Sequence, residues 1–152
     1  MKAALDRVLA LLLAGLLCTS ALAAGPFNTT PRGARYQDLQ PGSGAVAAPG
    51  DLVTMHFTGW LDDRGRQGKE LYNSRREGHT VSFVVGTDRV MPGWSEGVTG
   101  MQPGGRRLVL LPPALGYGAR AVDKVIPANS SLMFMIELLD VRPSAPGNRP
   151  QP

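Results

Sequence analysis

Glycine and proline interrupt this chain so often that little of it can form long helices. The 152 residues include 19 glycines and 13 prolines, spread without a repeating period. Glycine weakens a helix interior, and proline removes a backbone donor and clashes with the preceding turn. The missing period excludes a collagen-like chain, and the density of turn residues disfavours a helical bundle. Short strands joined by many turns are therefore predicted.

Strand patterns dominate the middle of the chain. Residues 52–61 alternate in polarity, which places Val53, Met55 and Phe57 on one face of a predicted strand. His56 faces the other way in mid-strand, and we interpret it as a structural residue. Four further strands are predicted over residues 36–39, 81–85, 106–111 and 132–141. Two segments without a strand pattern, 62–70 and 116–131, are predicted to be long loops, which are usually functional in a compact domain.

A single short helix is predicted over residues 92–99. Pro92 suits the first helical position, and Gly100 suits the position after the end. Because two glycines lie inside the segment, packing must hold this helix in place. Its buried stripe would be Val90, Met91, Trp94 and Val98. The predicted fold class is α+β, with a twisted antiparallel sheet whose concave face holds the helix.

The first residues have the features of a secretory signal peptide. Lys2 and Arg7 precede a ten-residue apolar run at 8–17, and small residues at 20–24 offer a cleavage site after Ala23 or Ala24. A retained anchor and a lipoprotein modified at Cys18 are the alternatives. The predicted organisation is a signal peptide at 1–23, a flexible tether at 24–34, a folded domain at 35–142 and a disordered tail at 143–152. We expect a periplasmic or secreted monomer without stable membrane insertion.

Composition excludes several kinds of chemistry. One cysteine rules out a disulfide framework, and two histidines argue against an all-protein zinc site. The net charge is +4, but the basic residues are scattered and do not alternate with aromatic residues, so nucleic acid is not an expected partner. The chain has no G-x-S-x-G, Walker-type or H-E-x-x-H motif. We expect no cofactor and no metal.

Several motifs occur together in one order along residues 36–141. They are His56-Phe57-Thr58-Gly59, Asn73-Ser74-Arg75, VMPGWSEGV at 90–98, Gly116-Tyr117-Gly118-Ala119, Val125-Ile126-Pro127 and LMFMIELL at 132–139. In this order and spacing they resemble the FKBP-type peptidyl-prolyl cis-trans isomerases. The resemblance implies a five-stranded antiparallel half-barrel wrapped around one short helix. It also implies an enzyme that accelerates X–Pro isomerisation in exported proteins.

The resemblance further implies a dry pocket that binds proline. Trp94 would be its floor, and its walls would be Phe57, Leu71, Val81, Phe83, Val90, Met91, Ile126 and Phe134. The implied polar contacts are the Tyr117 hydroxyl and the backbone N–H groups of Met91 and Ile126, with Tyr72 beside them. Expected partners are proline-containing peptides, unfolded exported proteins and ligands of the macrolide immunosuppressant type.

The chain departs from the usual family pattern on one side of this pocket. Leu71 stands in place of an aromatic wall, and Tyr72 in place of an aspartate that helps to orient the bound amide. Phe57 and Val81 stand where a tyrosine and an aromatic rim residue are common. These departures leave two functions open. One is an isomerase of reduced activity, in which the Tyr72 hydroxyl replaces the carboxylate. The other is a proline-peptide-binding chaperone module with little turnover. A half-barrel without any pocket is a third, structural alternative.

Overall fold

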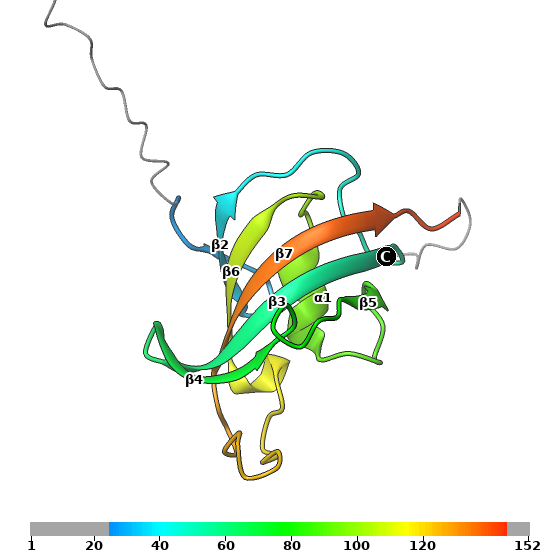
Figure 1. The fold of residues 1–152 in the computed structure, drawn as a ribbon. Coiled ribbons are helices and arrows are strands. Elements are labelled where there is room, and N and C mark those ends of the chain that lie inside the picture. Colours follow the sequence, from blue (N-terminus) through cyan, green and yellow to red (C-terminus); the bar gives the residue numbers. More distant parts are fainter. Residues whose placement is uncertain (1–24, 146–152) are drawn as a thin grey trace, which may run out of the picture.

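A curved antiparallel sheet with one short helix against its inner side makes up the fold (Figure 1). The computed structural model describes residues 25–145. The elements in chain order are β1 (Asn28–Thr29), β2 (Arg35–Gln40), β3 (Leu52–Asp63), β4 (Arg66–Asn73), β5 (Val81–Val84), α1 (Pro92–Val98), β6 (Arg106–Leu111), the 3₁₀ turn η1 (Pro113–Leu115) and β7 (Leu132–Arg142). The α+β prediction, an antiparallel sheet around a single short helix, is confirmed.

The long strands β3 and β7 form the centre of the sheet. The strand order is β1-β2-β6-β7-β3-β4, and β5 also pairs with β3. Val53, Met55 and Phe57 are buried on the inner face of β3, as the alternation predicts. Ile136 and Leu138 of β7 are fully buried beside them. These side chains form the core between the sheet and α1.

One edge of β3 is shared by two short strands. Residues 52–55 pair with β5, and residues 58–63 pair with β4. The segment 74–80 lies between these two strands, so β4 and β5 act as one interrupted strand beside β3. With β2, β6, β7 and β3, this interrupted strand accounts for the five strands that the resemblance implies, and β1 is an addition at the far edge.

The prediction of a loop over residues 62–70 is wrong. Here β3 runs on to Asp63 and returns as β4 through a two-residue turn at Arg64 and Gly65. Both turn residues have positive φ, 53° and 83°, as a tight hairpin turn of the primed type requires. The charged composition of this segment concealed the hairpin, because both strands are largely exposed there and carry no apolar alternation.

Helix α1 lies close to β6 and β7 because two of its residues lack a side chain. Gly93 and Gly97 are buried against the sheet. A Cβ atom built on Gly93 would lie 2.2 Å from Leu111 Cδ1, and one on Gly97 would lie 3.2 Å from Ile136 Cδ1. The glycines that weaken the helix are therefore the residues that allow it to dock. The helix spans residues 92–98, one residue shorter than the predicted 92–99, and it buries Val98 as predicted.

The described parts of the segments on either side of the predicted domain contact that domain. The signal peptide predicted over 1–23 and the tail from residue 146 lie outside the described residues. Within the segment predicted as a tether, Asn28 and Thr29 pair with β2, and Ala34 is fully buried. At the other end, the Ser144 N–H donates to Oδ1 of the fully buried Asp51 at 3.0 Å. No helix in the described range is long and apolar enough to cross a membrane.

Candidate functional site

A cavity of about 280 Å³ opens between the sheet, α1 and the loop before β7. Its lining is mostly apolar and aromatic, and we call it the aromatic cavity. It is lined by Phe57, Gly59, Leu71, Tyr72, Val81, Met91, Trp94, Tyr117, Ile126 and Phe134. Each of the elements β3, β4, β5, α1 and β7 contributes at least one residue. Two of the lining residues, Tyr72 and Val81, lie close to the ends of β4 and β5 that face each other across the break between these strands.

Trp94 is at the centre of the aromatic cavity. Its ring lies 4.8 Å from Phe57, 5.8 Å from Phe83 and 6.1 Å from Phe134 between centroids. The contact with Phe134 is nearly perpendicular, at 87°, which is a favoured aromatic geometry. The indole Nε1–H is buried without a hydrogen-bond partner among the described residues. Three rings thus fix the tryptophan, while the only polar atom of its side chain has no partner among the described residues.

Two of the predicted wall residues do not line this cavity. Phe83 is 6% exposed and packs against Trp94, so it supports the floor rather than facing a ligand. Val90 faces a separate hollow beside β5, together with Leu52 and Val84. The structure brings the other predicted wall residues together as expected: Phe57, Leu71, Val81, Met91, Ile126 and Phe134.

Some polar groups at the cavity have a hydrogen-bond partner among residues 25–145, and others have none. The Tyr117 side chain is 40% exposed, and its hydroxyl has no partner within residues 25–145. The Met91 N–H likewise has no acceptor in that range. The Ile126 N–H, which the resemblance implies as a ligand contact, instead donates to the Val122 carbonyl at 3.0 Å. This difference arises because residues 122–126 close a tight turn that uses the donor internally.

Tyr72 is held at the mouth of the cavity by two contacts. Its ring stacks on Phe57 with centroids 5.2 Å apart and an interplanar angle of 21°. Its hydroxyl lies 2.5 Å from Nε2 of His79, an exposed residue in the segment between β4 and β5. The hydroxyl is therefore already engaged in a hydrogen bond in the absence of a ligand.

Two residues of this site were missed by the sequence reasoning. Gly59 lines the cavity, and a Cβ built there would lie 2.8 Å from Cε1 of Phe134. Its place two residues after Phe57 on an alternating strand was the available signal. His79 had no such signal, because its approach to Tyr72 depends on the path of the chain between β4 and β5.

The comparison with protein families finds one match, which spans most of the fold. The model of the FKBP-type peptidyl-prolyl cis-trans isomerases matches residues 44–139. The chain belongs to this family. All residues that line the aromatic cavity fall within the matched range. The FKBP-type assignment therefore covers the strands, the helix and the loops that form the site.

Known FKBP-type proteins share both the sequence and the fold. The chain is 42% identical over 105 residues to the FK506-binding protein of Neisseria meningitidis serogroup A, covering 69% of this chain and 93% of that protein. The crystal structure of FkpA from Escherichia coli matches with a TM-score of 0.67 and 38% identity, over 78% of this chain and 53% of that chain. The crystal structure of AtFKBP13 matches with a TM-score of 0.67 and 31% identity, over 76% and 98%.

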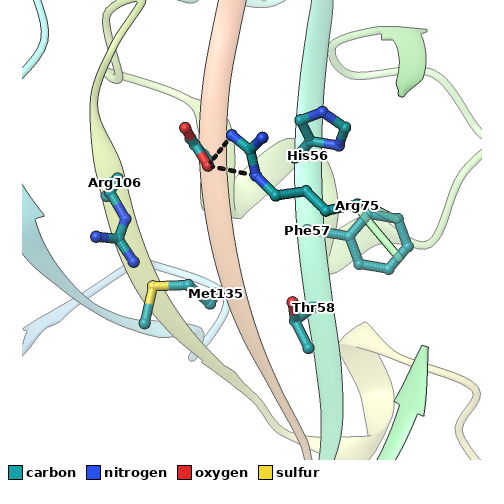
Figure 2. Close-up of a pocket in the computed structure, with 7 residues that line it drawn as sticks. His56, Phe57, Thr58, Arg75, Arg106 and Met135 are labelled. Carbon is teal, nitrogen blue, oxygen red and sulfur yellow. Dashed lines mark hydrogen bonds and ion pairs between the residues drawn. The ribbon is translucent and has the colours of Figure 1, made fainter. Parts of the chain in front are cut away.

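A second pocket lies on the outer face of this FKBP-type sheet. It is smaller, about 120 Å³, and is lined by His56, Phe57, Thr58, Arg75, Arg106, Met135 and Glu137. The Arg75 guanidinium pairs with the carboxylate of Glu137 in β7, and Figure 2 shows the Arg75 side chain reaching over β3 toward it. The hydrogen bond from Arg75 lowers the pKa of Glu137, and burial opposes this shift only in part. His56 Nδ1 bonds the buried Ser74 hydroxyl at 2.8 Å, which agrees with a structural role for this histidine.

No three His, Cys, Asp or Glu side chains gather into a metal-binding group within residues 25–145. The titratable side chains that line the aromatic cavity are Tyr72 and Tyr117. The chemistry that such a site supports is therefore binding in a dry environment with a few hydrogen bonds.

Proposed function

We propose that this chain accelerates X–Pro isomerisation by holding the proline ring in the aromatic cavity. The observation that carries the proposal is the convergence of apolar walls on Trp94 beside two donors, the Tyr117 hydroxyl and the Met91 N–H, that have no acceptor among residues 25–145. A cavity of about 280 Å³ is large enough to take a prolyl ring and part of its neighbours.

The physical task is to lower the barrier to rotation about the X–Pro amide. Resonance makes this barrier about 18–20 kcal/mol, and the planar amide is more polar than the twisted transition state. An apolar site disfavours the planar form relative to the twisted one, and donors placed for the twisted geometry add differential binding. No covalent intermediate is required for such a reaction.

In this proposal the cavity around Trp94 offers apolar walls and a few polar groups. Phe57, Val81, Ile126 and Phe134 hold the proline ring by apolar contact, and Leu71 extends this wall. The Tyr117 hydroxyl and the Met91 N–H donate to carbonyl groups of the peptide. Ile126 acts through its side chain, since its N–H is bonded to Val122. Tyr72 contacts the peptide at the mouth.

The substrates we propose are exported proteins that fold outside the cytoplasm. The signal-peptide pattern at residues 1–23 supports this location. We also propose that the cavity accepts macrolide ligands, because a relative with 42% identity is named an FK506-binding protein. Both statements extend the family assignment to this particular chain.

A second function, proline-peptide binding with little turnover, is favoured by one observation. At the position where the resemblance implies an aspartate, Tyr72 supplies no carboxylate, and its hydroxyl is already bonded to Nε2 of His79. If the reaction needs that aspartate, the cavity would bind proline and release it unchanged.

A protease-coupled assay of short X–Pro peptides tests the proposed function. We expect the wild type to accelerate isomerisation and Tyr117→Phe to lower kcat/KM by about three- to tenfold, the effect of losing one uncharged hydrogen bond. Tyr36→Phe is the matched control, because Tyr36 lies away from the cavity, with its ring beneath Arg107.

Two results would contradict parts of the proposal. Equal kcat/KM in Tyr117→Phe and Tyr36→Phe would remove Tyr117 from the reaction. No acceleration by the wild type, with activity gained in Tyr72→Asp, would establish the binding module and locate the missing chemistry at Tyr72.

A further inference from the structure

The contact between Tyr72 and His79 has a definite direction. Nδ1 of His79 lies 3.3 Å from the backbone carbonyl oxygen of Glu77. A carbonyl can only accept, so this contact assigns the proton to Nδ1, and in that tautomer Nε2 presents a lone pair. The Tyr72 hydroxyl, 2.5 Å from Nε2, therefore donates its proton to His79.

The chain around His79 is fixed by a series of short-range hydrogen bonds. We call residues 73–79 the 73–79 turn. Oδ1 of Asn73 accepts from the N–H groups of Arg75 and Arg76, both at 3.1 Å. The His79 N–H donates to the Ser74 carbonyl at 3.1 Å. Because Ser74 is fully buried and its hydroxyl accepts from the Phe57 N–H, the turn is attached directly to β3.

The orientation of the hydroxyl determines what Tyr72 offers to a ligand. Its only proton is committed to Nε2, so the oxygen retains lone pairs alone. The ring is stacked on Phe57 and lines the aromatic cavity, which keeps that oxygen at the mouth. A bound peptide would therefore meet a hydrogen-bond acceptor at this position.

We propose that His79 is a positioning residue that makes Tyr72 an acceptor, so that the cavity prefers prolyl peptides that present a backbone N–H beside the proline. This inference rests on the proposed function, because it concerns the peptide held in the aromatic cavity. It assigns a role in substrate selection to a residue that does not line the cavity itself.

The direction of the bond is tested by imidazole ¹⁵N NMR on the whole protein. The wild type should show His79 as the Nδ1–H tautomer with Nε2 as acceptor. Tyr72→Phe should change the Nε2 shift of His79 while leaving His56 unaffected. A protonated Nε2 in the wild type at neutral pH, or no change in Tyr72→Phe, would overturn the proposal.

Selection is tested with peptides in which one amide is replaced by an ester. One peptide loses the N–H after proline, the other loses the N–H of the residue before it, and a third is unaltered. The ratio of amide to ester kcat/KM is compared between protein variants, so that intrinsic differences between the peptides cancel. The variants are Tyr72→Phe, His79→Leu, His79→Gln and the control Thr80→Val, an exposed neighbour of His79.

We expect the wild type to disfavour at least one ester by about three- to tenfold, the effect of one uncharged hydrogen bond. The ratio of amide to ester kcat/KM should fall close to one in Tyr72→Phe and His79→Leu. The penalty should persist in His79→Gln, whose amide oxygen can accept from the Tyr72 hydroxyl, and in Thr80→Val. A penalty that is absent in the wild type, or equal in every variant, overturns the inference.

The same ratios are measured from Kd if the wild type binds the peptides without turnover. In that case the proposed catalysis fails while the role of His79 is still decided. Normal turnover by the wild type with an unchanged ratio in His79→Leu gives the opposite result: the proposed function stands and the role of His79 fails. No binding of any peptide would overturn both.

Discussion

Trp94 shows most clearly how one side chain can serve both stability and binding. Three aromatic rings surround it on the inner side, and its remaining face lines the aromatic cavity. The buried indole N–H has no partner in the described part of the chain, which costs part of the stability that the ring contributes. A smaller aromatic residue would avoid that cost but would leave a deeper cavity.

Replacing Trp94 by alanine should lower both stability and binding. We expect the free energy of unfolding to fall by about 3–5 kcal/mol, the usual range for truncating a large aromatic residue in a core. Trp94→Phe should lose less, because it keeps a ring and removes the unpaired N–H. Urea unfolding and peptide titration measure the two effects. Unchanged peptide affinity in a folded Trp94→Phe or Trp94→Ala variant would show that the cavity is not the binding site.

Single residues were predicted from the sequence to different degrees. The identity of the wall residues came from the resemblance, and most of them meet in the structure, as Phe57 and Phe134 do. Val90 does not line the cavity with them, because it faces the separate hollow beside β5. The His79 contact could not be predicted, since it depends on the positive φ of 78° at Gly78 and on the hydrogen bonds of the 73–79 turn.

At the scale of elements, the position of α1 on the sheet depends on its glycines. The helix has seven residues, no side-chain cap and two internal glycines, so it has little intrinsic stability. Its glycines instead let the backbone come close to Leu111 and Val109 of β6. This close approach places Trp94 against the inner face of the sheet, where the cavity forms.

The two glycines give a matched pair of variants. Gly93→Ala should destabilise the protein by about 1–3 kcal/mol, because its Cβ would lie 2.2 Å from Leu111 Cδ1 and 2.8 Å from the Leu115 carbonyl oxygen. Gly97→Ala meets its neighbours only at 3.2 Å and gains about 1 kcal/mol of helix propensity, so its net effect should be smaller. Thermal unfolding of both variants compares them. An equal or larger loss in Gly97→Ala would contradict the docking argument.

Elements with a clear apolar pattern were predicted well, and elements without one were not. The limits of β6 match the prediction at both ends, and β7 differs by one residue. The β3–β4 hairpin was missed because its strands are exposed and charged, and only Gly65 marked the turn. The strand β1 was missed because two paired residues leave no periodic signal.

At the scale of the whole molecule, the outer face of the sheet contributes to the geometry of the inner one. The Arg75–Glu137 pair on the outer face attaches the 73–79 turn to β7, and the same turn carries His79 toward the cavity mouth. The pKa of Glu137 is lowered, chiefly by the hydrogen bond from Arg75. Because the Arg75–Glu137 pair holds the 73–79 turn, protonation of Glu137 links the pH dependence of the protein's stability to the segment beside the cavity.

This linkage has a definite sign. A carboxylate whose pKa is lower in the folded than in the unfolded state stabilises the fold above its unfolded pKa, and the contribution is lost as pH falls through the folded value. Arg75→Gln should therefore be less stable than the wild type at neutral pH, by less than about 1 kcal/mol for an exposed pair. The difference should shrink below the ordinary glutamate pKa of about 4.3.

Urea unfolding between pH 3 and 7 measures this difference. Arg120→Gln serves as the control, because Arg120 forms no ion pair within the described residues. A gap between Arg75→Gln and the wild type that widens as the pH falls would show that the pair does not act as described.

In the proposed function, X–Pro isomerisation takes place while the proline ring lies against Trp94. One NMR sample, holding the labelled protein and a short X–Pro peptide, tests both parts of this claim. We predict exchange cross-peaks between the cis and trans peptide that strengthen with protein concentration, together with NOEs from the proline ring to the Trp94 indole and the Phe134 ring. NOEs without enhanced exchange would reduce the protein to a binding module, and enhanced exchange without NOEs to these rings would place the reaction elsewhere on the molecule.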